Sequence, residues 1–556
     1  MRPDFLEQTD ESNLARFSRV AEYGRRIELS NACGVRAGVA LSAVNVRRES
    51  RDEAYDVVVI GSGIGGLSAA AVLAKAGKKV LVVERHDRPG GYTHAFRRKK
   101  YLFDAAVHLI GGCEPVGTSE GRGLIDGLLR LLSVRDRCEF LRVDPFYTAV
   151  FPGFRIDAPL GSEEFIQAHL RHFPREEDGF RRLMKACDGI SREVRRFPQE
   201  LSFWDVVRMP RRFPTLTKYH KATLGAVADE YLTDPRLKAV FAALWPYLGL
   251  PPSRLSFVYW SAMLMSFIEE GAFYCRGSFQ NLADAFVQGL EKHGGELMLR
   301  NSVRRILIKD RRVTGVMLEN GQRISTPVVI SNADARQTFE ELVGVELLPR
   351  RFVKSLERMK PSLSAFVVFM ATDLDTSQLG AAHEMLSYRS WDHDETYQAI
   401  QQGEPHGIAI TIPTLVDPSL APAGQHLVIV TTLIPYEIAS SWRREKDRYS
   451  ELLMRELEAV LPGLRGHITF AEGASPRTME RYTLNLTGSI YGWEVSPEQV
   501  GRNRLGHDTP IRGLYLSGHW TQPGGGIYGV TVSGLQTSQM VLGYESVGDL
   551  FKALQA

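Results

Sequence analysis

A glycine-rich turn between two apolar runs constrains this chain more than any other feature of its sequence. Gly61, Gly63 and Gly66 give the spacing G-x-G-x-x-G, after the apolar run 57–60 and before the alanine-rich run 67–76. A buried strand, a tight turn and a helix, in that order, are what a dinucleotide site requires. Because the N–H groups at the start of such a helix face the turn, the pattern predicts a pyrophosphate site there.

A second apolar run supports this interpretation and narrows the choice of dinucleotide. Residues 79–83 read as the next buried strand, and Glu84 follows directly. An acid about 20 residues after the last glycine accepts hydrogen bonds from ribose hydroxyls. A carboxylate there repels a 2′-phosphate, so NADP is disfavoured. The glycine spacing alone is also typical of ordinary turns, but the two strands and the acid together favour the dinucleotide.

Further motifs carry a resemblance to known families. Gly90-Gly91, shortly after Glu84, resembles the extended fingerprint of two-dinucleotide-binding flavoproteins, which implies FAD held without a covalent link. The hairpin from Gly90 to Phe96, then Phe103-Asp104 and His108-Leu-Ile-Gly111, resembles the phytoene desaturase, carotenoid isomerase and retinol saturase superfamily of FAD-dependent oxidoreductases. The segment around His108 is most similar to the retinol saturase branch.

The resemblance implies a set of FAD contacts drawn from distant parts of the chain. It places a strand valine, here Val303, at the adenine through its backbone, and a C-terminal glycine loop, 524–526, beside the flavin. His519 stands where many flavoproteins of this class have an acid for the ribityl chain. The expected FAD contacts are Gly61, Gly63, Ile64, Gly65, Gly66, Glu84, Arg85, Gly90, Gly91, Val303, Gly518, Gly525, Gly526, Ile527 and Val530.

The order of elements predicts an α/β protein with a discontinuous, Rossmann-type FAD domain. We expect this domain to comprise residues 54–117, 273–340 and 476–556, with a last helix over 531–542. Residues 118–272 read as a mostly helical cap, and residues 341–475 as an interleaved β-rich region that binds substrate. Residues 1–53 read as a flexible N-terminal extension.

Composition restricts the classes of function. A net charge of +3 gives no argument for nucleic acid as a partner. Five scattered cysteines suggest neither disulfides nor a metal site, which fits a reducing cytosol. No run of 18 or more apolar residues predicts a membrane span. The aromatic and basic stretch 203–221 reads either as a solvated loop over the cap or as a peripheral contact with a membrane surface.

The expected reaction is flavin chemistry on an apolar polyene or isoprenoid lipid. Flavin supplies the redox step, and three outcomes share such a site: desaturation, saturation of a double bond, and cis–trans isomerisation. Saturation needs a proton donor near the ring, and the candidate catalytic residues are Tyr528, which we favour, His108 and His519. Each of these side chains also has an ordinary structural interpretation; for His108 it is a packed histidine bonded to a backbone carbonyl.

The leading hypothesis is therefore a saturase or isomerase that works through reduced FAD. A carotenoid desaturase is the nearest alternative among enzymes, and an amine oxidase is a third. A non-catalytic carrier of prenyl lipids, similar to the Rab GDP-dissociation inhibitors, is the alternative from another class. The intact Glu84, Gly90-Gly91 and Gly524–Gly526 favour an enzyme, because a carrier has no need of every flavin contact. The sequence does not identify the electron donor or acceptor.

Overall fold

The computed structural model describes residues 54–113, 123–198 and 203–555, and the expected N-terminal extension 1–53 lies outside them. A five-stranded parallel sheet forms the nucleotide-binding part, in the order β19-β13-β1-β2-β9. Its strands are β1 (Val57–Ile60), β2 (Val80–Val83), β9 (Glu296–Met298), β13 (Val328–Ser331) and β19 (Leu514–Leu516). These strands come from all three segments that we assign to the FAD domain.

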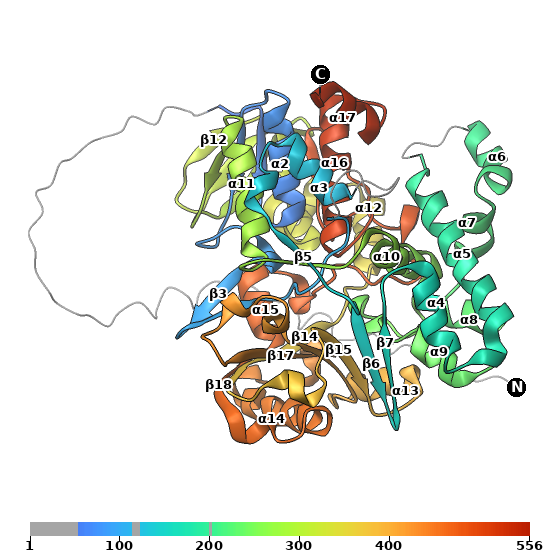
Figure 1. Cartoon of the computed structure of the whole chain (residues 1–556). Coiled ribbons are helices and arrows are strands. Elements are labelled where there is room, and N and C mark those ends of the chain that lie inside the picture. The colour runs from blue at the N-terminus through green and yellow to red at the C-terminus, as the bar shows by residue number, and fades with distance from the viewer. Residues whose placement is uncertain (1–53, 114–122, 199–202, 556) are drawn as a thin grey trace, which may run out of the picture. The chain divides into compact units, whose positions relative to one another are not determined.

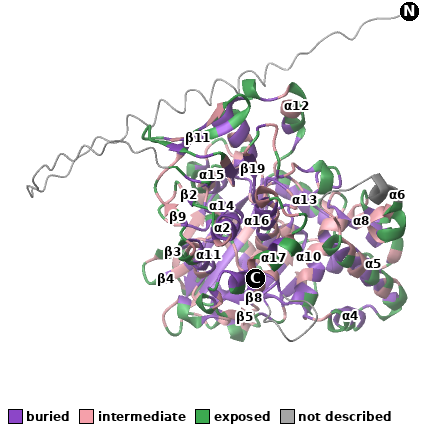
Figure 2. Cartoon of the chain, turned by 90° about the horizontal axis from the view of Figure 1, so that it is seen from above, coloured by how far each residue is buried: buried purple, intermediate pink, exposed green. Residues whose placement is uncertain are grey.

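Two different layers cover the two faces of this sheet (Figure 1). On one face Val57, Val59, Val80 and Val82 pack with helix α2 (Ile64–Lys75), which contacts α11 (Gln280–Lys292) and α16 (Ile527–Leu542). The alternate residues Val58, Ile60, Leu81 and Val83 pack against a three-stranded antiparallel sheet, β10 (Val303–Lys309), β11 (Arg312–Leu318) and β12 (Arg323–Ser325). Helix α2 is buried from Ile64 to Ala74 (Figure 2), as expected for an alanine-rich helix between two layers.

A seven-stranded sheet forms the second part, in the order β18-β14-β17-β16-β15-β6-β7. Five strands are β14 (Ser364–Thr372), β15 (Glu384–Tyr388), β16 (Gly407–Thr411), β17 (His426–Ile434) and β18 (Ile468–Ala474). The other two, β6 (Tyr147–Phe151) and β7 (Phe154–Ala158), come from the stretch that the sequence indicated as mostly helical. β6 runs parallel to β15, whereas the other neighbours are antiparallel.

The two faces of the seven-stranded sheet differ in what they pack against. Met385, Ile408 and Val430 point to the side covered by helix α14 (Trp442–Val460). Leu386, Tyr388 and their neighbours on β14 and β17 belong to the core that also contains the FAD-domain helices. We call this second side the inner face; residues alternate between the two sides along each strand.

Helices fill most of residues 162–270. They are α4 (Ser162–Leu170), α5 (Glu177–Arg195), α6 (Phe203–Arg212), α7 (Pro214–Tyr219), α8 (Leu224–Tyr231), α9 (Pro235–Phe241) and α10 (Phe257–Glu270). The stretch 203–221 is therefore mainly helical, and not the loop that we expected. None of the helices in the described ranges combines the length and apolarity needed to cross a bilayer.

The remaining elements are short and complete the two parts. They are β3 (Ala95–Arg98), β4 (Tyr101–Asp104), α3 (Leu124–Leu131), β5 (Phe140–Arg142), β8 (Phe273–Cys275), α12 (Arg350–Arg358), α13 (His393–Gln401), α15 (Pro476–Thr483) and α17 (Val547–Gln555). The prediction that the last helix spans 531–542 was wrong in two respects. Helix α16 begins at Ile527, and α17 follows it.

Candidate active site

The N-terminus of α2 forms the first part of the site. Gly63 is the N-cap, the cap has no side-chain hydrogen bond, and the first turn has no acidic residue. The first helical bond runs from the Leu67 amide to the Gly63 carbonyl, at 2.9 Å. The amides before Leu67 therefore have no partner within the helix, and the helix dipole favours an anion beside them.

Glycine is required here by close packing between distant segments. A Cβ on Gly65 would lie 2.7 Å from the Gly518 Cα, and one on Gly91 would lie 3.2 Å from the Gly63 Cα. A Cβ on Gly66 would overlap the Gly61 carbonyl oxygen. Side chains at these positions would fill the space between the three segments, so the glycines keep a cradle of backbone open.

Asn332 is a residue of this cradle that our sequence interpretation missed. It follows β13, and its side chain lies against Gly63, Gly65 and Gly518; the Asn332 Nδ2 atom is 2.7 Å from the position of a Cβ on Gly63. The Ser-Asn-Ala-Asp motif at 331–334 was assigned only to the exit of the chain from the FAD domain. Asn332 lies at the carboxyl end of a parallel strand, and its role could have been predicted from that position.

Glu84 is held in a fixed orientation at the end of β2. Its Oε2 accepts hydrogen bonds from the Ser62 amide at 2.8 Å and the Ser62 hydroxyl at 2.7 Å, and its Oε1 accepts from the His86 amide at 2.7 Å. The side chain is half-buried. Oε1 accepts only one hydrogen bond and keeps a second lone-pair direction, so the group can still accept from a ribose hydroxyl.

The other expected contacts of the nucleotide end occupy different environments. Ile64 is buried in the core, so only its backbone can face the cradle. Val303 is buried at the start of β10 and pairs with Leu318. Arg85 lies on the surface, where its guanidinium donates to the Arg481 carbonyl at the end of α15. Burial lowers the pKa of Arg85, and Glu84 opposes this effect.

The C-terminal glycine loop presents a second helix start. Gly526 is the N-cap of α16, again without a side-chain hydrogen bond or an acid in the first turn. The Val530 amide already donates to the Gly526 carbonyl at 2.9 Å, so the open amides are those of the residues before Val530, including Ile527. Tyr259 donates its hydroxyl to the Gly525 carbonyl at 3.0 Å and so fixes the loop.

These features fit FAD. Two helix N-termini without side-chain capping bonds suit its phosphates and the negative charge that a reduced flavin carries, and the carboxylate of Glu84 suits its adenosine ribose. When bound, FAD supplies the transfer of hydride or electrons, while the protein contributes position and proton chemistry. Among the residues that the structure describes, no cluster of three or more potential ligands could hold a metal ion.

His519 lies beside Arg504, a buried cation that sequence reasoning did not single out. Arg504 is 2% exposed and donates to the His519 carbonyl at 2.6 Å and to the Thr521 carbonyl at 3.0 Å. Burial, with a smaller effect of Arg504, lowers the pKa of His519 to about 3. His519 is therefore neutral at physiological pH, and it has no net charge to offer in place of the acid found in related proteins.

Tyr528 lies in the first turn of α16, with its ring against Gly112: a Cβ on Gly112 would lie 3.0 Å from two ring carbons. Burial and the charge of Glu270 raise the pKa of Tyr528. Its phenol therefore keeps its proton at neutral pH.

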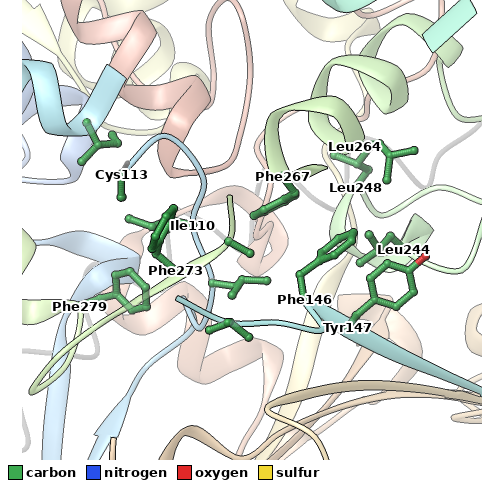
Figure 3. Close-up of a cluster of buried hydrophobic side chains, with 14 of the residues drawn as sticks. Ile110, Cys113, Phe146, Tyr147, Leu244, Leu248, Leu264, Phe267, Phe273 and Phe279 are labelled. Carbon is green, nitrogen blue, oxygen red and sulfur yellow. The ribbon is translucent and has the colours of Figure 1, made fainter. Parts of the chain in front are cut away.

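His108 lies in the segment between β4 and Gly112, which is tied to β8. Ile110 and Phe273 exchange backbone hydrogen bonds of 3.0 and 2.8 Å, and their side chains meet those of Cys113 and Phe279 in an apolar cluster (Figure 3). The His108 Nδ1 lies 3.3 Å from the Thr411 hydroxyl of β16. Its Nε2 is buried, with no hydrogen-bond partner among the described residues. Burial lowers the pKa of His108 to about 3, so its ring is neutral.

The fold and this cradle define a two-dinucleotide-binding flavoprotein. Residues 64–542 match the family described as flavin containing amine oxidoreductase, and the chain belongs to this family. An oxidoreductase of known structure from Methanosarcina mazei shares the fold, with a TM-score of 0.58 and 19% identity over 87% of this chain and 99% of its own. The protein is thus an FAD-dependent oxidoreductase of the superfamily that the sequence resembled.

Three relatives are similar over most of their length. Prolycopene isomerase 2 of an Oncidium hybrid cultivar is 30% identical over 90% of this chain and 86% of its own. All-trans-retinol 13,14-reductase of Rattus norvegicus is 29% identical over 84% of this chain and 82% of its own. The lycopene-forming phytoene desaturase of a Paracoccus species is 26% identical over 88% of this chain and 97% of its own. The carrier hypothesis is not favoured, because these relatives are named as enzymes.

Proposed function

We propose that this enzyme saturates or isomerises a carbon–carbon double bond of a long apolar polyene or isoprenoid lipid, through reduced FAD. One observation carries the proposal. The chain is similar over most of its length, and at nearly equal identity, to an isomerase of prolycopene and a 13,14-reductase of all-trans-retinol. Both names denote a change at a double bond of a polyene, and neither requires an oxidised product.

The structure supports this proposal through the position of its polar groups. His108 contacts Thr411 on the inner face of the seven-stranded sheet, and its segment reaches Tyr528, in the first turn of α16, at Gly112. Both side chains are neutral at physiological pH, since burial lowers the pKa of His108 and raises that of Tyr528. Neutral groups that can donate a proton suit an apolar substrate better than fixed charges do.

Anaerobic incubation with chemically reduced FAD and a panel of polyenes tests the proposal. The panel contains retinol, prolycopene and phytoene, and product mass and retention time are measured. A gain of two hydrogens means saturation, and an unchanged mass with a shifted retention time means isomerisation. Reduced FAD without protein is the control. Failure to change any polyene under these conditions would overturn the proposal.

A lycopene-forming desaturase is the second candidate, on the strength of the similarity that spans 97% of the Paracoccus enzyme. This reaction removes hydrogen and therefore needs oxidised FAD and an electron acceptor. Phytoene that loses hydrogens only when a quinone or oxygen is supplied would favour it over saturation.

We also propose a peripheral membrane contact through the arginines at the end of α6. Arg208, Arg211 and Arg212 are exposed, whereas the aromatic rings of Phe213 and Tyr219 are buried. The attraction would thus be to anionic headgroups, without insertion of these rings. Co-sedimentation with phosphatidylserine vesicles, compared with phosphatidylcholine vesicles, tests it, and substitution of all three arginines by Ser should abolish any preference for the anionic lipid.

A further inference from the structure

A buried carboxyl group lies on the inner face of the seven-stranded sheet. Glu384 begins β15, and because residues alternate along a strand it shares its side with Leu386 and Tyr388, which belong to the core next to the FAD domain. Met385, between them, packs on the α14 side. Glu384 is 2% exposed. The carboxyl therefore faces the interior between the two parts of the molecule.

Strand pairing connects this carboxyl to His108. Glu384 and Thr411 are directly opposite each other on β15 and β16. The Thr411 hydroxyl lies 2.8 Å from the Glu384 Oε2 and 3.3 Å from the His108 Nδ1, within hydrogen-bond distance of both. The neighbouring His383 donates from Nε2 to the His108 carbonyl at 3.0 Å and so holds the histidine in place. The result is a continuous chain from Glu384 through Thr411 to His108.

The surroundings of Glu384 leave it protonated. Tyr247 is hydrogen-bonded to Glu384, Tyr491 interacts with it electrostatically, and His108 is linked to it through Thr411. Burial raises the pKa of Glu384 to about 8, against the smaller effects of its hydrogen bonds to Thr411 and Tyr247. A carboxyl group that keeps its proton at neutral pH is a proton store.

The chain of hydrogen bonds is close to the flavin side of the molecule. The backbone of Tyr491 packs against Gly525 of the glycine loop, with its carbonyl oxygen 3.3 Å from the position of a Cβ there. The His108 segment ends at Gly112, against the ring of Tyr528. The buried Nε2 of His108, which has no partner among the described residues, is the free end of the chain. A carboxyl group that served only to hold the strands together would not need to be connected to an unpartnered ring nitrogen.

We propose that Glu384, Thr411 and His108 form a proton relay that delivers one proton to the substrate double bond. This inference rests on the proposed function and specifies its proton donor. The O–H bond of Glu384 breaks as Thr411 takes that proton, and Thr411 passes its own hydroxyl proton to the His108 Nδ1. The N–H bond at Nε2 of His108 breaks, and a new C–H bond forms on the substrate.

When bound in the cradle, reduced FAD would supply the hydride for the second C–H bond, so that the double bond would gain two electrons and two hydrogens. Glu384 is left as a carboxylate, with Thr411 donating to it, and takes a proton from water before the next turnover. The same two hydrogen bonds, with their directions reversed, describe the chain before and after delivery. His108 is the donor that meets the substrate, while Glu384 and Thr411 act through it.

The first test concerns the ground state and needs no substrate. Infrared spectroscopy of the full-length protein, with and without FAD, should show the carbonyl band of a protonated carboxyl group that disappears in Glu384→Gln. The same band should shift in Thr411→Val, which removes the hydroxyl and keeps the shape. Glu472→Gln, at an ion pair with Arg98 near the surface, is the control and should leave the band unchanged. Bands of other buried carboxyl groups, such as Asp104, are common to both proteins, so a spectrum that is unchanged in Glu384→Gln would overturn the proposal.

The second test concerns turnover of the reduced enzyme in D₂O, read as product mass. Wild-type product should contain deuterium from solvent, and Glu384→Gln and Thr411→Val should form product roughly 100-fold more slowly. Thr411→Ser keeps the hydroxyl and should restore the rate to within about threefold of wild type, which a purely structural role of Thr411 does not require. FAD content and reduction by dithionite should be the same in all variants.

The outcomes separate the relay from the function on which it rests. If wild type converts no polyene, the proposed function fails, and the infrared band alone decides whether Glu384 stores a proton. If wild type converts a polyene but Thr411→Val matches Thr411→Ser, the relay is overturned. If Tyr528→Phe abolishes deuterium delivery while Glu384→Gln does not, Tyr528 is the donor and the relay is overturned as well.

Discussion

The nucleotide end and the substrate end of this site are built by different means. At the nucleotide end, backbone atoms of Gly61–Gly66, Gly91 and Gly518 meet, and the contact depends on the absence of side chains. At the substrate end, polar side chains of His108, Thr411 and Glu384 meet. The first arrangement is intolerant of added atoms, whereas the second depends on protonation and on hydrogen-bond direction.

The largest effect should follow from adding one methyl group at the nucleotide end. Gly66→Ala would place a Cβ over the Gly61 carbonyl oxygen, which is backbone and cannot rotate away. We expect FAD binding to be lost, and the free energy of unfolding to fall by about 3 kcal/mol. Flavin absorbance of the purified protein and thermal unfolding measure the two effects.

Gly127→Ala is the matched control for this prediction. Gly127 lies within α3, where an added Cβ meets no atom within 4 Å. Alanine favours a helix over glycine by up to about 1 kcal/mol, so this variant should keep FAD and unfold at an equal or higher temperature. Normal FAD content in Gly66→Ala would show that the cradle can relax, and the contrast between the two ends would then fail.

The protonation of Glu384 at the substrate end should make the free energy of unfolding depend on pH. The Glu384 pKa is about 8 in the folded chain, against an ordinary value of 4.5. Between these values the unfolded chain loses the proton and the folded chain keeps it, so stability falls as pH rises from about 4.5 to 8, by about 1.4 kcal/mol for each unit of pKa difference. Below about pH 4.5 the contribution of Glu384 to the free energy of unfolding is fully present.

Glu384→Gln removes this contribution. Relative to wild type, the variant should become progressively more stable from pH 5 to pH 8, as read from unfolding temperatures. Asp104 and Asp334, whose burial raises their pKa values to about 7 and about 6, titrate in both proteins and cancel in the comparison. A difference in unfolding temperature between the two proteins that stays constant with pH would contradict a raised pKa at Glu384.

The contrast between the two ends also explains what the sequence could predict. The glycine turn, Glu84 and the β-rich character of residues 341–475 are local patterns, and the structure has β14, β16 and β17 in that region. β15 was not predicted, because Glu384, its first residue, and His383 just before it interrupt the apolar pattern of a buried strand. These polar residues are tolerated there only through partners that other segments supply.

Partners distant in sequence account for the rest of what was missed. Thr411 and His108 are 303 residues apart, and β15 pairs with β6 from the stretch that was expected to be helical. Arg504 likewise has no motif, yet it is buried and donates to the carbonyls of His519 and Thr521. Such contacts arise from tertiary packing, which local propensity does not encode.

A smaller effect is expected at Glu84, whose carboxylate we expect to accept hydrogen bonds from the ribose of FAD. Glu84→Gln keeps the shape but loses the charge that accepts from Ser62 and His86. Hydrogen bonds to charged groups contribute about 1.5–3 kcal/mol, so FAD affinity should fall roughly 10- to 100-fold. Titration of the apoprotein with FAD, followed by flavin fluorescence, measures this change.

Asp87→Asn is the control for Glu84. Asp87 is on the same loop, and its ion pairs with Arg88 and Arg300 are exposed, where such pairs contribute little. FAD affinity should therefore be unchanged in Asp87→Asn. An equal loss in both variants would mean that the charge of the loop, and not the orientation of Glu84, governs binding.

The smallest effect should come from His519, which directly follows Gly518 of the glycine cradle. Its Nε2 is 3.4 Å from the Asn485 Nδ2, at the limit of a hydrogen bond, and its ring packs loosely against Tyr92, with centroids 6.1 Å apart. Its lowered pKa, about 3, means that it does not titrate between pH 5 and 8. His519→Gln should change FAD affinity and turnover by less than about fivefold, as loss of a weak contact worth about 1 kcal/mol implies, and should leave the pH–rate profile of the wild type unchanged. A shift of the acid limb of that profile in His519→Gln would show that the histidine titrates during catalysis. The groups that exchange protons would then include His519 at the nucleotide end, and the contrast between the two ends would not hold.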